Sequence, residues 1–296
     1  MSSFVSWFII IGTLGSLLGV FLLLWLNKNV SRPGQTTGHS YDGIQEYDNP
    51  LPAWWFWWFI LTIVFGLGYL VWYPGLGNFK GVGGWTSVKQ LEHDQALAKA
   101  KYGPIFAQYR DVPVDQLAQD PEAHKMGRRL FTINCSQCHG ATATGSFGFP
   151  NLTDDEWMWG GSGVQIETTI SGGRQAAMPA WGPVLGDTGV NEVASYVMSL
   201  SGRQVDPAVA GKGEALFKTY CVTCHGPDGK GNALFGAPNL TNEIWLYGNS
   251  KQQIEHTIKN GRNGQMPTFK NKLGEDKVHI LAAYVKSLSS KPSPDS

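Results

Sequence analysis

The run Cys135-Ser136-Gln137-Cys138-His139 is the stretch around which this chain is organised. A C-x-x-C-H run is typical of a covalent attachment site for c-type haem. Two thiols three positions apart lie on one side of a helical turn, where each can add to one haem vinyl group. The histidine that follows directly then faces the iron. Half a zinc site and a thioredoxin-like redox pair are the alternatives for a bare C-x-x-C.

The same run returns as Cys221-Val222-Thr223-Cys224-His225, again with its histidine. The chain has 4 cysteines, all of them in these two runs, so none remains for a structural disulfide or a zinc site. We therefore expect two covalently bound c-type haems. The expected thioether and proximal iron ligands are Cys135, Cys138, His139, Cys221, Cys224 and His225.

Similarity between the two copies extends well beyond the cysteines and indicates an internal repeat. Matched residues include Gly127 with Gly213, Phe131 with Phe217, Pro150-Asn151-Leu152-Thr153 with Pro238-Asn239-Leu240-Thr241, and Tyr196 with Tyr284. The repeat predicts two helical haem domains, residues 125–203 and 207–290, each using its haem as apolar core. Within the first domain we expect Phe131 to pack on Tyr196, where the first and last helices cross.

A methionine followed by proline recurs at the same place in both copies, as Met178 and Met266. Thioether sulfur is a soft ligand that raises the potential of a haem iron. A methionine by itself is more often core filler, but the matched positions favour axial ligation. The default assigns Met178 to the haem of His139 and Met266 to that of His225, and a crossed assignment stays open.

Other residues that match between the two copies lie close to these candidate ligands in the sequence. Arg174 and Arg262 precede the methionines and either bind haem propionates or lie in solvent. Asn151 and Asn239 either fix their loops or hydrogen-bond a propionate. His124 and His256 have no matched histidine in the other copy, which argues against bis-histidine ligation.

Two apolar stretches near the N-terminus predict membrane-spanning helices, within residues 1–30 and 53–73. A cleaved signal peptide is the alternative for the first, but no Lys or Arg precedes it and no Ala-x-Ala site follows. Residues 31–52 form a polar loop between the spans. Residues 74–124 form a linker with a polar helix, which we expect to run from Ser87 to about Lys101, before Gly103-Pro104 interrupts it.

Two spans place both ends of the chain on one side of the membrane. Thioether-bound haem is made outside the bacterial inner membrane, so we expect the haem domains in the periplasm and the loop in the cytoplasm. Lys28, at the end of the first span, and Arg32, in that loop, agree with the positive-inside rule. The formal net charge of +0 gives no indication of nucleic-acid binding.

One further stretch discriminates among dihaem proteins: residues 38–44, Gly-His-Ser-Tyr-Asp-Gly-Ile, and 48–52, Asp-Asn-Pro-Leu-Pro, running into Trp54-Trp55. Together with the aromatic-rich second apolar stretch and the two C-x-x-C-H domains with Met-Pro, it resembles a known family. The chain is similar to the membrane-anchored dihaem cytochrome c subunit of cbb3-type cytochrome c oxidases, called CcoP, FixP or subunit III. The likeness covers about residues 36–290.

The resemblance implies an all-α chain with two N-terminal transmembrane helices followed by two tandem class I cytochrome c domains. It implies an electron-transfer subunit that takes electrons from periplasmic donor cytochromes. The partners would be a monohaem cytochrome c subunit and the haem–copper subunit that reduces oxygen. The sequence has no histidine cluster for copper, so this chain does not itself reduce oxygen. A dihaem cytochrome of another respiratory complex and a dihaem peroxidase are the alternatives.

Overall fold

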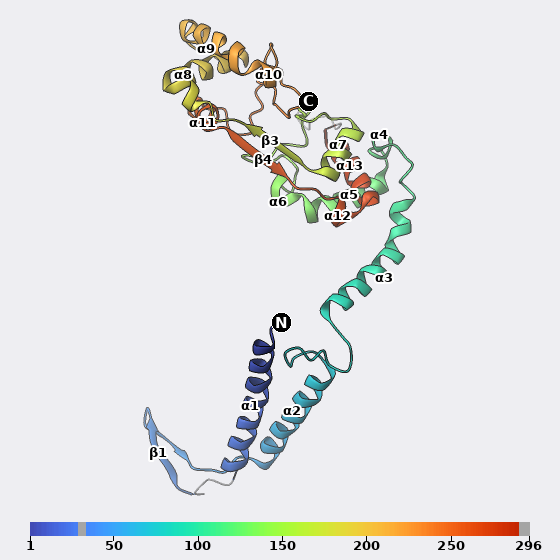
Figure 1. The fold of residues 1–296 in the computed structure, drawn as a ribbon, viewed down its shortest axis with the longest axis vertical. Coiled ribbons are helices and arrows are strands. Elements are labelled where there is room, and N and C mark those ends of the chain that lie inside the picture. The colour runs from blue at the N-terminus through green and yellow to red at the C-terminus, as the bar shows by residue number, and fades with distance from the viewer. Residues whose placement is uncertain (29–33, 290–296) are drawn as a thin grey trace. The chain divides into compact units, whose positions relative to one another are not determined.

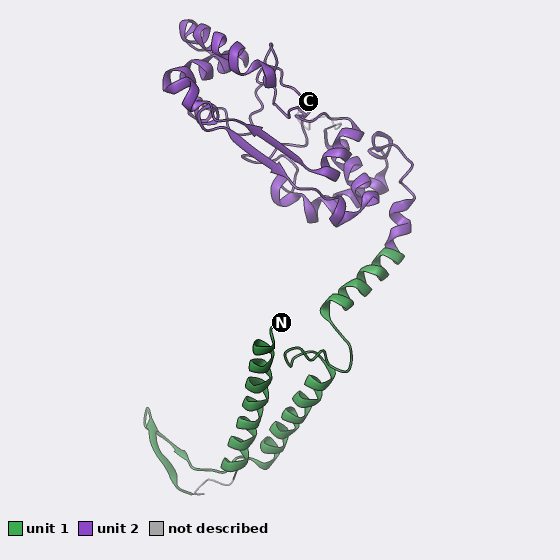
Figure 2. Cartoon of the chain, in the orientation of Figure 1, with its two compact units in different colours: residues 1–101 green, residues 102–296 purple. Residues whose placement is uncertain are grey.

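The computed structural model describes residues 1–28 and 34–289. The chain divides into two compact units, Met1–Lys101 and Tyr102–Ser296 (Figure 2). Three expectations fall outside the described residues: Arg32, the boundary drawn between residues 30 and 31, and the last position of the second haem domain, residue 290.

The first unit contains the two apolar helices, α1 (Ser3–Asn27) and α2 (Ala53–Trp72). Both are long and apolar enough to cross a membrane. They pack on each other near the end of α1, where Leu24 and Phe56 are buried. At the start of α1 the hydroxyl oxygen of Ser6 accepts a hydrogen bond of 2.9 Å from the Asn78 amide, which follows α2. The expected spans are thus observed as helices that are paired at both ends.

Two elements of this part of the chain differ from expectation. The polar loop contains an antiparallel hairpin of β1 (Thr36–Tyr41) and β2 (Ile44–Tyr47). Helix α3 (Ser87–Ala107) does not end before Gly103-Pro104 but continues through Pro104. Proline inside a helix removes one amide hydrogen bond and favours a kink or a break. Here the Gln108 amide still bonds the Pro104 carbonyl at 3.3 Å.

The second unit is mostly helical, and the two sequence repeats supply matching series of elements (Figure 1). A short helix α4 (Val114–Leu117) precedes the repeats. The first repeat gives α5 (Pro121–Asn134), α6 (Ser136–His139), α7 (Gly163–Gly172), β3 (Arg174–Met178) and α8 (Gly182–Leu200). The second gives α9 (Pro207–Tyr220), α10 (Val222–His225), α11 (Lys251–Asn260), β4 (Arg262–Met266), α12 (Lys270–Leu273) and α13 (Glu275–Ser289). Helix α8, with a kink at Gly186, corresponds to α12 and α13 together.

The last helices of the two repeats are exchanged. Helix α13 packs on α5, and α8 packs on α9. The expected contact of Phe131 with Tyr196 is therefore wrong: the Phe131 ring lies 5.5 Å from that of Tyr284, and the Tyr196 ring lies 5.2 Å from that of Phe217. The aromatic residues do meet where first and last helices cross, but each pair joins one repeat to the other.

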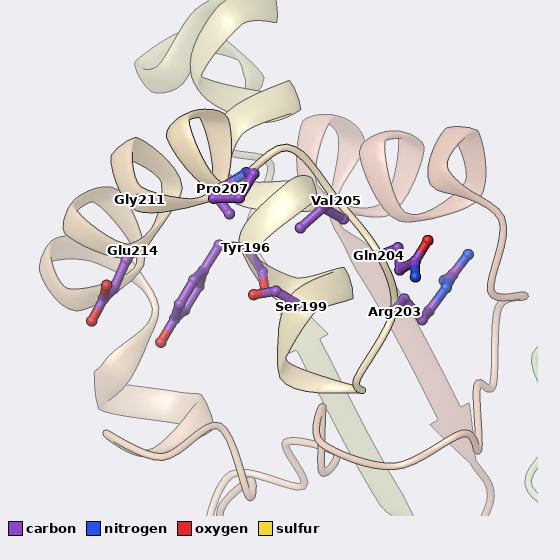
Figure 3. Close-up of a pocket in the computed structure, with 9 residues that line it drawn as sticks. Tyr196, Ser199, Arg203, Gln204, Val205, Pro207, Gly211 and Glu214 are labelled. Carbon is purple, nitrogen blue, oxygen red and sulfur yellow. The ribbon is translucent and has the colours of Figure 1, made fainter.

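A short connection explains this exchange. Only residues 201–206 separate α8 from α9, and consecutive helices joined by a short loop usually pack side by side because closing a short loop costs little entropy. A pocket of about 420 Å3 marks the turn, lined among others by Tyr196, Arg203, Val205 and Glu214 (Figure 3). Because α9 covers the packing surface of α8, the equivalent surface of α5 remains free to pack against α13.

Strands β3 and β4 form an antiparallel ribbon between the two helix groups (Figure 1). Its register pairs Arg174 with Met266 and Met178 with Arg262. The all-α expectation thus missed two short ribbons, β1–β2 and β3–β4, although the chain is mostly helical. In both ribbons the partner strand supplies the backbone hydrogen bonds, which a sequence-based search for helical periodicity does not detect.

Candidate functional site

Each C-x-x-C-H run forms one helical turn after the first long helix of its repeat. Helix α5 ends at Asn134, Cys135 links it to α6, and the His139 amide bonds the Cys135 carbonyl at 2.9 Å. The second run has the same geometry, with the His225 amide at 2.9 Å from the Cys221 carbonyl. The predicted placing of both thiols on a single helical turn is confirmed.

Glycine follows each histidine because the chain must leave the turn in a left-handed conformation. Gly140 has φ 79° and Gly226 has φ 77°, values that a residue with a side chain rarely adopts. The chain then folds back so that the Gly145 amide bonds the His139 carbonyl at 2.9 Å. The histidine backbone is thereby fixed on both sides.

A proline carbonyl orients each histidine ring. The Nδ1 atom of His139 lies 2.9 Å from the carbonyl oxygen of Pro150, and Nδ1 of His225 lies 3.3 Å from that of Pro238. Because a carbonyl can only accept, Nδ1 carries the proton and donates it. Nε2 is then the unprotonated nitrogen, which is the form that binds a metal.

Burial of the two imidazole rings also favours their neutral form. It lowers the pKa of the His139 imidazole, although the hydrogen bond to Pro150 works against the shift. Burial lowers the pKa of His225 too, opposed by Pro238. Both rings are therefore neutral at pH 7, as an iron ligand must be.

The four thiols form no disulfide. Burial, with a smaller effect of Cys138, raises the pKa of Cys135 to about 11, and burial with Cys224 raises that of Cys221 to about 11. Cys138 is exposed and Cys224 is half-buried. In each run the first cysteine is therefore the more buried of the two.

The sequence predicted only part of the role of the loop that follows each histidine. The side-chain oxygen of Asn151 accepts from the Thr153 amide at 2.9 Å and hydroxyl at 2.7 Å, and Asn239 does the same for Thr241. Of the two roles considered for these asparagines, fixing the loop is confirmed. The proline carbonyls were missed, although the repeated Pro-Asn-Leu-Thr signalled them.

The predicted methionine ligands lie beside the opposite repeats. Met266 packs against the core cluster that includes Phe131, Ile166 and Ile170 of the first repeat, and Cys135 packs against the same cluster. Met178 packs against the cluster that contains Phe217, Cys221 and other second-repeat residues. The structure thus places Met266 in the same cluster as Cys135 and Met178 in the same cluster as Cys221.

Backbone contacts at both ends of the β3–β4 ribbon fix this arrangement. After Met266, the Phe269 amide bonds the Ile170 carbonyl at 3.1 Å, and after Met178 the Trp181 amide bonds the Ile258 carbonyl at 3.0 Å. Ile170 lies in the last turn of α7 in the first repeat, and Ile258 lies in the last turn of α11 in the second. Each Met-Pro segment is therefore anchored on the other repeat by hydrogen bonds as well as by packing.

The two matched arginines lie opposite the methionines in the ribbon. The Arg174 side chain donates to the Thr169 hydroxyl at 2.9 Å and lies 4.8 Å from the Trp159 ring. Arg262 donates to the Thr257 hydroxyl at 2.7 Å and lies 4.2 Å from the Tyr247 ring. Both are half-buried, and neither forms an ion pair within the described part of the chain.

Comparison with known proteins follows the division of the chain. A family model described as the N-terminal domain of cytochrome oxidase-cbb3, FixP, matches residues 33–80. A second, cytochrome c oxidase cbb3-type subunit III, matches residues 122–197 and 208–285. The stretch recognised in the sequence and both haem repeats are therefore matched separately.

Whole-chain relatives agree with these matches. The chain is 44% identical over 272 residues to a cbb3-type cytochrome c oxidase subunit CcoP of Rubrivivax gelatinosus, covering 91% of this chain and 89% of the relative. It is 43% identical to the FixP subunit of Azorhizobium caulinodans, covering 86% of this chain and 92% of the relative. It is 38% identical to the CcoP subunit of Cereibacter sphaeroides, covering 87% and 96%.

Proposed function

The chain belongs to the CcoP and FixP family of cbb3-type cytochrome c oxidase subunit III, and from that membership we propose how its haem sites are built and connected. It is an electron-transfer subunit of a cbb3-type oxidase and carries covalently bound c-type haems. The haem supplies the one-electron chemistry, and the chain supplies attachment, ligation and orientation.

The proposed attachment residues are those of the two helical turns. Cys135 and Cys138 hold one haem through thioether bonds and Cys221 and Cys224 the other, with His139 and His225 as proximal ligands. The free thiols and the histidine Nδ1 hydrogen bonds, which leave Nε2 for iron, support this assignment. It places both haems against the core, where the repeats of residues 125–203 and 207–290 need apolar filling.

Our central proposal for the site is that the distal ligands cross between the repeats. Met266 serves the haem of His139, and Met178 serves the haem of His225. The observation that carries this is that each methionine packs against the same cluster as the other repeat's first cysteine. The exchange of α8 and α13 supports it, because each helix follows its own methionine into the opposite repeat.

Arg174 and Arg262 are proposed to bind haem propionates. A half-buried guanidinium without a carboxylate among its described partners favours binding an external anion. In the ribbon register each arginine lies opposite the methionine proposed for the haem of its own repeat, Arg174 opposite Met266 and Arg262 opposite Met178. One arginine and one methionine from different repeats would thus serve each haem.

We propose that α1 and α2 cross the bacterial inner membrane and that the haem repeats lie in the periplasm. The length and apolarity of both helices support this, and thioether attachment of haem outside the inner membrane sets the direction. The hairpin between the spans is then cytoplasmic. At the end of α1 the Lys28 ammonium lies 3.6 Å from the Trp25 ring centroid, a pairing suited to the membrane interface.

The proposed electron route enters from a periplasmic donor cytochrome. Electrons pass through the two haems of this chain to a monohaem cytochrome c subunit and then to the haem–copper subunit, where oxygen is reduced. The relatives' designation as cbb3-type oxidase subunits supports a place in this complex over a peroxidase or another respiratory complex.

The crossed ligation can be tested in a chain with one haem. Changing Cys221 and Cys224 together to Ala leaves the haem of His139 alone. In that background Met266→Ala should abolish the methionine-to-iron charge-transfer band and lower the potential, because a soft ligand that favours ferrous iron is lost. Met178→Ala should leave both unchanged. Loss of the band in Met178→Ala but not in Met266→Ala would contradict crossed ligation. Retention of the band in both variants would contradict methionine ligation altogether.

A further inference from the structure

The hairpin of β1 and β2 has a well-defined turn but no core of its own. Tyr41 pairs with Ile44, and the two residues between them, Asp42 and Gly43, have φ of 51° and 83°. Positive φ at both central residues is the geometry of a two-residue type I′ turn, for which Asp-Gly is a preferred sequence. The sequence therefore specifies this hairpin locally.

Every residue of both strands is exposed. The exposed fractions of the largest side chains are 65% for Tyr41, 71% for Ile44 and 67% for Tyr47. An isolated two-stranded hairpin is marginally stable in water and needs a further strand or a packed face. The described residues of its own unit cover neither face, so the hairpin is suited to packing on another molecule.

The charge of the hairpin selects the kind of surface that can cover it. Residues 34–52 contain the carboxylates Asp42, Glu46 and Asp48 but no Lys or Arg. A cytoplasmic leaflet carries anionic lipids and repels such a segment. A protein surface with an excess of Lys and Arg attracts it instead. Cytoplasmic loops of membrane-spanning proteins have that excess.

We propose that the β1–β2 hairpin docks on a basic, cytoplasm-facing loop surface of a membrane-spanning partner subunit of the oxidase. Tyr41 and Ile44, adjacent on one face beside the turn, are the apolar anchors, and Asp42, Glu46 and Asp48 face Lys and Arg side chains of the partner. The inference rests on the proposed membrane topology, in which the loop between α1 and α2 is cytoplasmic.

The first experiment identifies what covers the hairpin in the intact complex. A photo-reactive phenylalanine analogue replaces Ile44 in the tagged full-length chain, and the cross-linked peptide is mapped after purification in detergent. A cross-link to a Lys- and Arg-rich cytoplasmic loop of a membrane-spanning oxidase subunit supports the proposal. Cross-links to lipid, to a second copy of this chain or to no protein at all overturn it.

The second experiment tests the two parts of the surface separately. Tyr41→Ser with Ile44→Ser, and Glu46→Lys with Asp48→Lys, should each reduce several-fold the partner subunits retained on the purified chain, measured as the ratio of haem b to haem c. Tyr41→Phe with Ile44→Val should retain them, as should Glu92→Gln with Asp94→Asn, exposed carboxylates of α3. Full retention in both disruptive variants would overturn docking.

A third measurement separates failure of docking from failure of the topology. Ser40→Cys introduces a free thiol on the hairpin, since the other cysteines are bound to haem. A membrane-impermeant maleimide should label it in inside-out vesicles and not in right-side-out vesicles. Labelling from the periplasmic side would overturn the proposed topology, and the docking inference with it. The haem c content per chain should be the same in all variants as in the unmodified chain.

Discussion

At the scale of single residues, the carbonyl oxygens of Pro150 and Pro238 determine the chemistry of the two histidines. Each accepts a hydrogen bond from the protonated Nδ1 and thereby leaves Nε2 as the unprotonated nitrogen. The C-x-x-C-H pattern predicted the histidines but not these partners, which lie 11 and 13 residues further along the chain. A hydrogen bond to a backbone atom leaves no identity requirement beyond a loop of the right shape, so motif spacing alone could not reveal it.

A second residue-scale feature is the ion pair of Arg110 with Asp276. The guanidinium Nε and Nη2 atoms lie 2.7 and 2.8 Å from the two carboxylate oxygens, which joins the segment before the first repeat to α13 of the second. The hydrogen bond and charge of Arg110 lower the pKa of Asp276, against the effect of burial. A lowered folded-state pKa means that the pair stabilises the fold above the unfolded pKa of about 3.9.

We therefore expect Arg110→Gln to lower the thermal midpoint slightly at pH 7, because an exposed pair contributes little. The difference from the unmodified chain should disappear as the pH falls through the folded-state pKa of Asp276, where the carboxylate is protonated. Thermal unfolding of the full chain in detergent, followed by circular dichroism, measures this. Lys125→Gln, which removes the exposed Lys125–Glu122 pair, is the control. A difference that grows on acidification would contradict the assignment.

At the scale of elements, two glycines allow the exchanged helices to approach closely. A Cβ atom on Gly127 of α5 would overlap the Tyr284 side chain of α13, and one on Gly213 of α9 would overlap the Glu192 carbonyl and Tyr196 side chain of α8. The repeat alignment identified both glycines as a matched pair. Only the structure shows that both glycines, Gly127 and Gly213, contact a helix of the other repeat.

Gly127→Ala and Gly213→Ala should each lower the free energy of unfolding by about 1–3 kcal/mol, because the added methyl group overpacks a close helix contact. Gly211→Ala is a matched control on the same helix as Gly213, since nothing lies within 4 Å of its added Cβ. It should leave stability unchanged or raise it by up to about 1 kcal/mol. Chemical denaturation followed by the haem absorption spectrum measures all three. Equal effects of Gly211→Ala and Gly213→Ala would argue against the close contact.

At the scale of the whole molecule, the exchange makes the two repeats mutually dependent. The cluster around Phe131 contains Val278, Leu281 and Tyr284 of α13, and that around Phe217 contains Val190, Val193 and Val197 of α8. Neither core cluster is completed by its own repeat. Two independent tandem domains would instead each retain a full core when the other is removed.

A chain truncated after residue 203 should therefore fail to form a native first haem site. It retains Cys135, Cys138 and His139 but loses α13 and Met266. We expect attached haem without the methionine-to-iron charge-transfer band, together with increased proteolysis, measured by spectroscopy and limited digestion. The full-length chain with Cys221 and Cys224 changed to Ala keeps α13 and is the control. A truncated chain with a native first-site spectrum would contradict mutual dependence.

The sequence by itself determined the attachment motifs, the repeat, the candidate methionines and the two apolar helices. These features depend on short-range patterns. Residue type and spacing identify the haem-attachment motifs, and the length of an apolar stretch shows whether it can span a membrane. The tertiary structure decided which helix packs on which, that Phe131 meets Tyr284 rather than Tyr196, and that each methionine lies beside the other repeat. Matched repeats present nearly equivalent surfaces, so α5, which leads into the run at Cys135–His139, could accept either copy's closing helix. The short connection between α8 and α9 decides which closing helix packs on α5, because it holds α8 beside α9. This effect is visible only in the three-dimensional packing.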